Sequence, residues 1–190
     1  MKRNIFKALA VVALAASLTS CGDDFLETKN YKGVDVDNGL SNASAVANAV
    51  NGEYYWLHDY RFAGNFAINI GEIPTDIAYW NAGTDHFNDI YQFTFTDQDN
   101  YLYGIWKYGN KVVDNSARAI KAAKNLYGAS SEEDKVTLDV AMGEAYALRG
   151  YANLLMVNVY GHQIKVDGQD FSSQPGLVIS EEPIAAFQEV

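Results

Sequence analysis

The stretch from Gly143 to Gly161 constrains the fold most, because small and apolar residues recur there at the spacing of one helix face. That face holds Ala141, Ala145, Leu148, Ala152, Leu155 and Val159. Gly143 and Gly150 lie inside the same expected helix, although glycine in a helix interior costs about 0.5–1 kcal/mol relative to alanine. Both glycines share a second face with Ala147, and we expect another helix to lie close against it. The stretch therefore predicts packed helical hairpins.

Arg149 lies on this expected helix among small and apolar neighbours. The positions three and four residues away are not acidic; they are Ala145, Tyr146, Ala152 and Asn153. If its side chain is buried, Arg149 needs a carboxylate or carbonyl partner from elsewhere in the fold. The alternative is that the aliphatic stem packs on the helix while the charge reaches water.

Two further helices are placed by their capping residues and apolar spacing. The first is expected from Ser41 or Asn42 to about His58. Its inner face is expected to hold Val46, Ala49, Val50, Tyr54 and Leu57. The second covers residues 101–126 and follows the polar residues 97–100, which serve as its start signal. Its inner face is expected to hold Ile105, Gly109, Val112, Ser116, Ala119 or Ile120, and Ala123.

The end of this second long helix and the start of the next carry their own signals. Asp114 and Arg118 are an acid-first pair at the i, i+4 spacing that stabilises a helix. Gly128 is expected to end the helix in a left-handed conformation. Ser130 and Glu133 match a capping box, which starts the next helix. Two long helices joined by a short polar turn form an αα-hairpin.

Aromatic residues gather in two other places. Four of them, Tyr54, Tyr55, Trp56 and Tyr60, lie near the end of the first helix and offer either a stacking platform for a glycan or a piece of core. We expect core, because aromatic residues at helical spacing are more often buried. Further on, Tyr91, Phe93 and Phe95 alternate with polar residues, which predicts a short extended segment with one buried face.

The first 40 residues read as export and anchoring signals. Lys2, Arg3 and Lys7 precede an apolar run at residues 8–16, as in a secretory signal peptide, and the run is too short to span a membrane. Residues 18–21 then match a bacterial lipobox that ends at Cys21, the only cysteine of the chain. We therefore expect a lipoprotein signal peptide at 1–20, lipidation of Cys21 and an acidic tether at 21–40. Ordinary secretion with an incidental cysteine is the alternative.

Three segments of the chain resemble one protein family. GEAYALRGYANLLMVNVYG is similar to the GEA-x-x-LRA-x-x-YF-x-L-x-x-x-YG helix of SusD-like (SusD/RagB) outer-membrane glycan-binding lipoproteins, with Gly150 in place of the usual alanine. CGDDFLE after the lipobox and GLVISEEP near the end also resemble this family. The resemblance implies a mainly α fold of tetratricopeptide-like helical hairpins with irregular, loop-rich insertions. It also implies that residues 41–190 are the N-terminal helical region of a longer SusD-like domain.

The resemblance also implies a function and a site. SusD-like proteins face the cell exterior, capture oligosaccharides or polysaccharides and pass them to a SusC-like TonB-dependent transporter. In this chain the family's G-E-x-x-T-D segment begins at Gly71 and leads into a loop whose glycan-binding candidates are Asp76, Tyr79, Trp80 and Asn81. An indole stacks on a pyranose while carboxylate and amide groups bind its hydroxyls. A tryptophan in such a loop is about as often a partly buried anchor as it is a platform for a ligand.

Other function classes find little support in the sequence. A net charge of -10 without a basic stripe argues against a nucleic-acid partner. The three histidines are scattered and no hydrolase or metalloprotease motif is present, so we expect no catalytic residues, metal ligands or cofactor. The aspartates at 35–37 lack the glycine and glutamate of a calcium loop. The alternative to glycan capture is a helical-repeat envelope lipoprotein that acts as a protein–protein scaffold.

Overall fold

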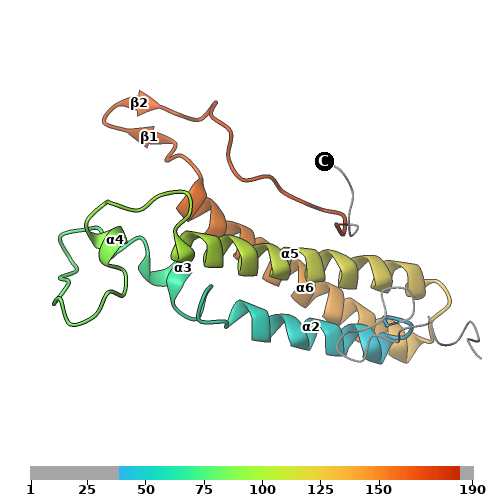
Figure 1. The fold of residues 1–190 in the computed structure, drawn as a ribbon. Helices are drawn as coiled ribbons and strands as arrows, with labels where there is room; N and C mark the ends of the chain where they lie inside the picture. Colours follow the sequence, from blue (N-terminus) through green and yellow to red (C-terminus); the bar gives the residue numbers. More distant parts are fainter. Residues whose placement is uncertain (1–38, 185–190) are drawn as a thin grey trace, which may run out of the picture. The chain divides into compact units, whose positions relative to one another are not determined.

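Helices dominate residues 39–184, the part of the chain that the computed structural model describes (Figure 1). The elements in chain order are α2 (Ala43–Leu57), α3 (Phe66–Asn69), α4 (Asn88–Tyr91), α5 (Asn100–Tyr127), α6 (Glu132–Tyr160), β1 (Lys165–Val166) and β2 (Gln169–Asp170). This arrangement confirms the mainly α class. The expected signal peptide at 1–20, Cys21 and most of the expected tether at 21–40 lie outside the described residues.

Three long helices form the core. α5 and α6 pack against each other and α2 lies against both (Figure 1). Fully buried side chains from all three helices, and Phe62 from the segment after α2, fill the space between them; they include Val50, Ile105, Leu138 and Met156. Complete burial of such side chains contributes about 1.5–3 kcal/mol each. The bundle is therefore held by apolar packing along the whole length of α5 and α6.

α2 begins and ends where its capping residues predict. The Asn42 side chain accepts a hydrogen bond from the Ala45 N–H at 2.9 Å, and His58 follows the last helical residue. The buried residues are Ala43, Val46, Val50 and Glu53. The expectation that Tyr54 lies on the inner face is wrong, because Glu53 continues the 43, 46, 50 spacing and Tyr54 is turned away from it.

The aromatic residues near the end of α2 are mostly exposed, so the prediction of a core cluster is wrong. Tyr55 is 70% exposed, and Tyr54 and Tyr60 are about half exposed. Trp56 is the most buried of the four, and its ring packs in a tilted arrangement against Tyr108 with centroids 6.0 Å apart. The spacing of these tyrosines places them beside the inner face rather than on it.

α5 matches the sequence prediction closely at its start and along its inner face. The Asp99 side chain accepts from the N–H groups of Tyr101 and Leu102, which confirms the polar residues at 97–100 as the start signal. Every residue expected on the inner face is buried. Asp114 and Arg118 form the expected ion pair, with Nε and Oδ2 2.8 Å apart.

The turn between α5 and α6 differs from the prediction at two residues. Gly128 has right-handed backbone angles, with φ -66° and ψ -27°, instead of the expected left-handed ones. The residue that caps α6 is Ser131, which accepts from the Asp134 N–H at 3.1 Å. Ser130 instead donates its hydroxyl to the Leu126 carbonyl at 2.9 Å and so caps the end of α5. Because the two serines are adjacent, the sequence did not show which of them caps the start of α6 and which caps the end of α5.

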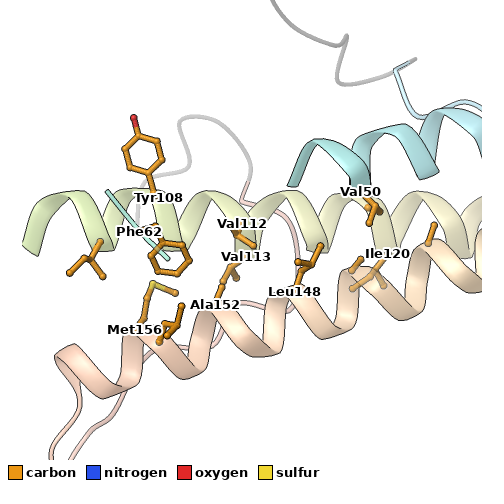
Figure 2. Close-up of a cluster of buried hydrophobic side chains, with 14 of the residues drawn as sticks. Val50, Phe62, Tyr108, Val112, Val113, Ile120, Leu148, Ala152 and Met156 are labelled. Carbon is orange, nitrogen blue, oxygen red and sulfur yellow. The ribbon is translucent and has the colours of Figure 1, made fainter. Parts of the chain in front are cut away.

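The close helix contact lies at a glycine of α5 and not at the glycines of α6. A Cβ at Gly109 would lie 2.8 Å from Met156 Cγ and 3.0 Å from the Phe62 ring. Figure 2 shows Phe62 and Met156 side by side at this point. Gly143 and Gly150 are exposed and have no atom within 4 Å of an added Cβ, so the expectation of a helix packed on their face is wrong within residues 39–184.

Residues 84–99 form a short helix and turns instead of the expected extended segment. α4 contains Tyr91, while Phe93 and Phe95 are exposed. Phe93 has a left-handed φ of 57°, and the Thr94 N–H donates to the Asp89 carbonyl at 2.9 Å. The alternation of aromatic and polar residues was therefore misleading, because Phe93 is in a left-handed turn conformation just after α4 and not in a strand.

The chain after α6 returns along the helices. β1 and β2 form a hairpin through Asp167 and Gly168, both with positive φ, as a two-residue turn requires. The chain then passes α6, where Arg149 donates to the Glu181 carbonyl at 3.1 Å. It reaches α5, where Lys121 and Glu182 form an ion pair at 2.9 Å. Arg149 thus takes a carbonyl partner from elsewhere in the fold.

Candidate functional site

The four glycan-binding candidates lie in the loop between α3 and α4, and aromatic packing holds this loop to the start of α5. Phe87, just before α4, stacks on Tyr101 with ring centroids 4.2 Å apart. Its N–H also donates to the Tyr101 hydroxyl at 2.9 Å. Phe66 of α3 meets both rings edge-on, with centroids 4.7 Å from Tyr101 and 5.4 Å from Phe87. The two ends of the loop are thus tied to one aromatic cluster on the helical core.

Two of the candidates make their polar contacts within the loop. The Trp80 indole Nε1–H donates to the Thr84 carbonyl at 2.9 Å, and its ring lies in a tilted arrangement 6.5 Å from that of Tyr91. Asn81 Oδ1 accepts from the Gly83 N–H at 2.9 Å. Trp80 is half-buried, so the alternative interpretation, a partly buried anchor, describes it better than an open platform. These two residues fix the shape of the loop.

The other two candidates reach solvent. Tyr79 is 86% exposed, and Asp76 is also exposed. Thr75 donates its hydroxyl to the Glu72 carbonyl at 2.6 Å and accepts from the Ile77 N–H at 3.3 Å, which fixes the backbone around Asp76. An exposed phenol ring can stack on a sugar, and an exposed carboxylate can accept hydrogen bonds from its hydroxyls. The loop therefore presents Tyr79 and Asp76 from a backbone stabilised by its own side chains.

Glu53 is a buried acid that was not among the residues expected on the inner face of α2. Its side chain is fully buried in the core, where Oε2 accepts from the Ser116 hydroxyl at 2.5 Å and Oε1 has no hydrogen-bond partner. Burial raises the pKa of Glu53 from 4.5 to about 7, while the Ser116 hydrogen bond acts in the opposite direction. Its position three residues after Val50 was the signal, since that spacing continues the inner face of α2.

The histidines of the described residues are placed apart from one another. His86 lies beside Tyr101, with Nδ1 3.4 Å from the hydroxyl, whereas His162 stacks on Phe171. Between residues 39 and 184, no group of three or more histidine, cysteine or acidic side chains is placed to hold a metal ion. No helix in the same range is both long and apolar enough to cross a membrane. In comparisons with known proteins, the chain matches no family model, no curated protein and no solved structure.

Proposed function

We propose that this protein is a SusD-like glycan-binding lipoprotein that captures oligosaccharides outside the cell and passes them to a SusC-like TonB-dependent transporter. The sequence support is the resemblance of residues 143–161 to the family's helix, together with CGDDFLE after the lipobox. The structural observation that carries the proposal is the loop between α3 and α4. It holds Tyr79 in solvent on a backbone fixed by the side chains of Trp80 and Asn81.

The proposed capture is a binding event in which no bond is made or broken. A sugar ring stacks on Tyr79 while Asp76 accepts hydrogen bonds from its hydroxyls. Because the loop is already held by internal hydrogen bonds, little conformational entropy is lost when the ligand binds. Such shallow contacts give modest affinity, and the lipid anchor compensates by keeping the binder close to its transporter.

The first test is removal of the Tyr79 ring. Tyr79→Ala should weaken glycan binding by about five- to tenfold, since stacking of this kind is worth roughly 1–1.5 kcal/mol. The melting temperature should not change, because the side chain is exposed. Affinity electrophoresis and a thermal melt measure the two effects. Tyr151→Ala, which removes an exposed tyrosine on α6, is the matched control, and an equal loss of binding in both variants would contradict the proposed site.

Membrane attachment through Cys21 is the second part of the proposal. Several acyl chains on one cysteine hold a protein to a membrane effectively permanently, whereas one chain does so only marginally. Cys21→Ala should therefore move the protein from the membrane fraction to the soluble fraction. Metabolic labelling with a fatty acid measures the modification directly. Labelling that persists in Cys21→Ala would contradict the anchor.

The proposed tetratricopeptide-like arrangement has support in a second apolar face of α6. This face carries exposed small and apolar residues at helical spacing, namely Val136, Val140, Gly143, Ala147, Tyr151 and Leu154. In stacked helical hairpins each repeat buries such a face against its neighbour. The face is also the observation that favours the alternative function, a scaffold between envelope proteins, because exposed apolar patches are typical of protein contacts.

A further inference from the structure

A shallow hollow with a volume of about 280 Å³ lies where the segment after α2 meets the first half of α5. Its walls are formed mainly by Arg61, Phe66, Tyr103, Lys107 and Tyr108. Gly104 is part of its lining, and a Cβ there would lie 3.2 Å from Arg61 Cβ and 3.3 Å from the Phe66 ring. The volume is close to the lower end of small-ligand pockets, roughly 300–1,000 Å³.

The hollow is bordered by cations. Arg61 is held in place by Asp59, with Nε and Nη2 each 2.9 Å from a carboxylate oxygen, and its guanidinium lies 4.1 Å from the centre of the Tyr108 ring. Lys107 extends from α5 one turn before Lys111. Neither lysine forms an ion pair with any residue between 39 and 184. An acidic chain, with 24 acidic and 14 basic residues, thus gathers positive charge here.

Lys111 lies one turn along α5 from Lys107, outside the lining of the hollow, and is held on an aromatic ring. Its Nζ lies 3.3 Å from the centre of the Trp56 ring. Partial burial and repulsion from Lys107 both lower the pKa of Lys111, while Asp59 opposes the shift. Like charges one turn apart on a helix destabilise it slightly, and an anion placed between them relieves that repulsion.

An exposed aromatic ring stands beside these cations. Tyr103 is 59% exposed, and its ring centre lies 5.6 Å from Lys107 Nζ. Tyr60, also exposed, packs edge-on against Phe66 at the other wall, with centroids 4.9 Å apart. Phe66 belongs to the aromatic cluster that ties down the Asp76–Asn81 loop. The hollow and the ends of the loop thus share one aromatic cluster, which includes Phe66.

We propose that this hollow binds an acidic sugar, a uronate residue of an oligosaccharide. The pyranose ring stacks on Tyr103 while its carboxylate pairs with Lys107 and with the N–H groups of Arg61 that Asp59 leaves free. A stacking ring beside cations suits a charged sugar better than an acidic peptide, which offers carboxylates without a rigid ring to stack. The inference rests on the proposed glycan capture and specifies its substrate class as acidic oligosaccharides.

Calorimetric titration with trigalacturonate and with its methyl ester tests the inference, because esterification removes the carboxylate charges and adds only a methyl group to each sugar ring. The unmodified protein should bind the acid more tightly, and added salt should reduce that preference. Lys107→Gln should weaken binding of the acid about tenfold and leave the ester unchanged. Tyr103→Ala should weaken the binding of both ligands. Lys165→Gln, which removes an exposed lysine on β1, is the charge control and should change neither.

The outcomes separate this inference from the proposed function. If the acid and the ester bind with equal affinity, and Lys107→Gln changes neither affinity, the acidic-sugar site is contradicted. Glycan capture itself is not affected by that result. Failure of every glycan to bind would remove both proposals. Equally strong competition by polyglutamate would show a general anion surface and would also overturn the assignment to a sugar. Thermal melts of each variant show whether the fold is retained.

Discussion

Gly109→Ala is expected to lower the free energy of unfolding by about 1–3 kcal/mol, although alanine is the better helix former. The added methyl group would meet Met156 and the Phe62 ring at distances that require both to move. Both side chains are almost completely buried, so neither can move into solvent. Urea unfolding followed by circular dichroism measures the change.

Gly150→Ala is the matched control, because it makes the same chemical change in the interior of a long helix. An added Cβ meets nothing within 4 Å there, so the variant should gain about 0.5–1 kcal/mol from helix propensity alone. The two substitutions should therefore have opposite signs. A stabilising Gly109→Ala, or a Gly150→Ala as damaging as Gly109→Ala, would contradict the packing described for α5 and α6.

Glu53→Gln is expected to remove most of the pH dependence of stability between about pH 4.5 and pH 7. The pKa of Glu53 is raised to about 7 in the fold, so the folded protein holds a proton that the unfolded chain releases near pH 4.5. The contribution of protonated Glu53 to the free energy of unfolding is fully present below pH 4.5 and is lost as the pH rises through 7. The loss amounts to about 3 kcal/mol for a shift of this size.

The measurement is urea unfolding at several pH values between 4 and 8. Relative to the unmodified protein, Glu53→Gln should gain stability as the pH rises and reach a constant difference above pH 7. Ser116→Ala removes the hydrogen bond that lowers the Glu53 pKa, so its pH-dependent loss should extend to higher pH. Glu72→Gln, at an exposed glutamate, should leave the profile unchanged. A pH profile that is the same with and without Glu53 would contradict this account.

Local sequence signals predicted the three long helices well, because each of them carries its own start and its own buried spacing, whereas the short α3 and α4 were not predicted. Asn42 and Asp99 cap α2 and α5 through side-chain oxygens, and these residue types have few other reasons to precede an apolar pattern. The inner face of α5 was also predictable, since its opposite face is clearly polar. In α6 the face of Ala141, Ala145, Leu148, Ala152 and Leu155 is buried, as its spacing predicted. The small residues of the second face did not indicate a packed helix, because that face is exposed.

The remaining errors have a common origin in neighbouring residues with equal local preference. Tyr54 and Glu53 are neighbours in the sequence. Glu53 is the one that is buried, and its side chain accepts a hydrogen bond from Ser116. Ser130 and Ser131 both suit a helix cap. The β1–β2 hairpin was missed although Asp167-Gly168 is a strong turn signal. A tertiary contact accompanies the first case, whereas the two serines differ only in local hydrogen bonds, to Leu126 and to Asp134.

The candidate site could be placed in a loop from the sequence, but its internal hydrogen bonds could not be predicted. Nothing in the order of residues shows that the Trp80 N–H bonds to Thr84 while Tyr79 remains open. The hollow was also beyond prediction, because it brings Arg61 of the segment after α2 against Tyr103 and Lys107 of α5. Such sites depend on how distant segments pack.

Glycan capture is tested by affinity electrophoresis in gels that contain a panel of neutral and acidic polysaccharides. At least one polysaccharide should retard the protein, and Tyr79→Ala should move faster in the same gel with an unchanged melting temperature. Mobility unaffected by every polysaccharide in the panel would contradict glycan capture and favour the scaffold function of the exposed α6 face.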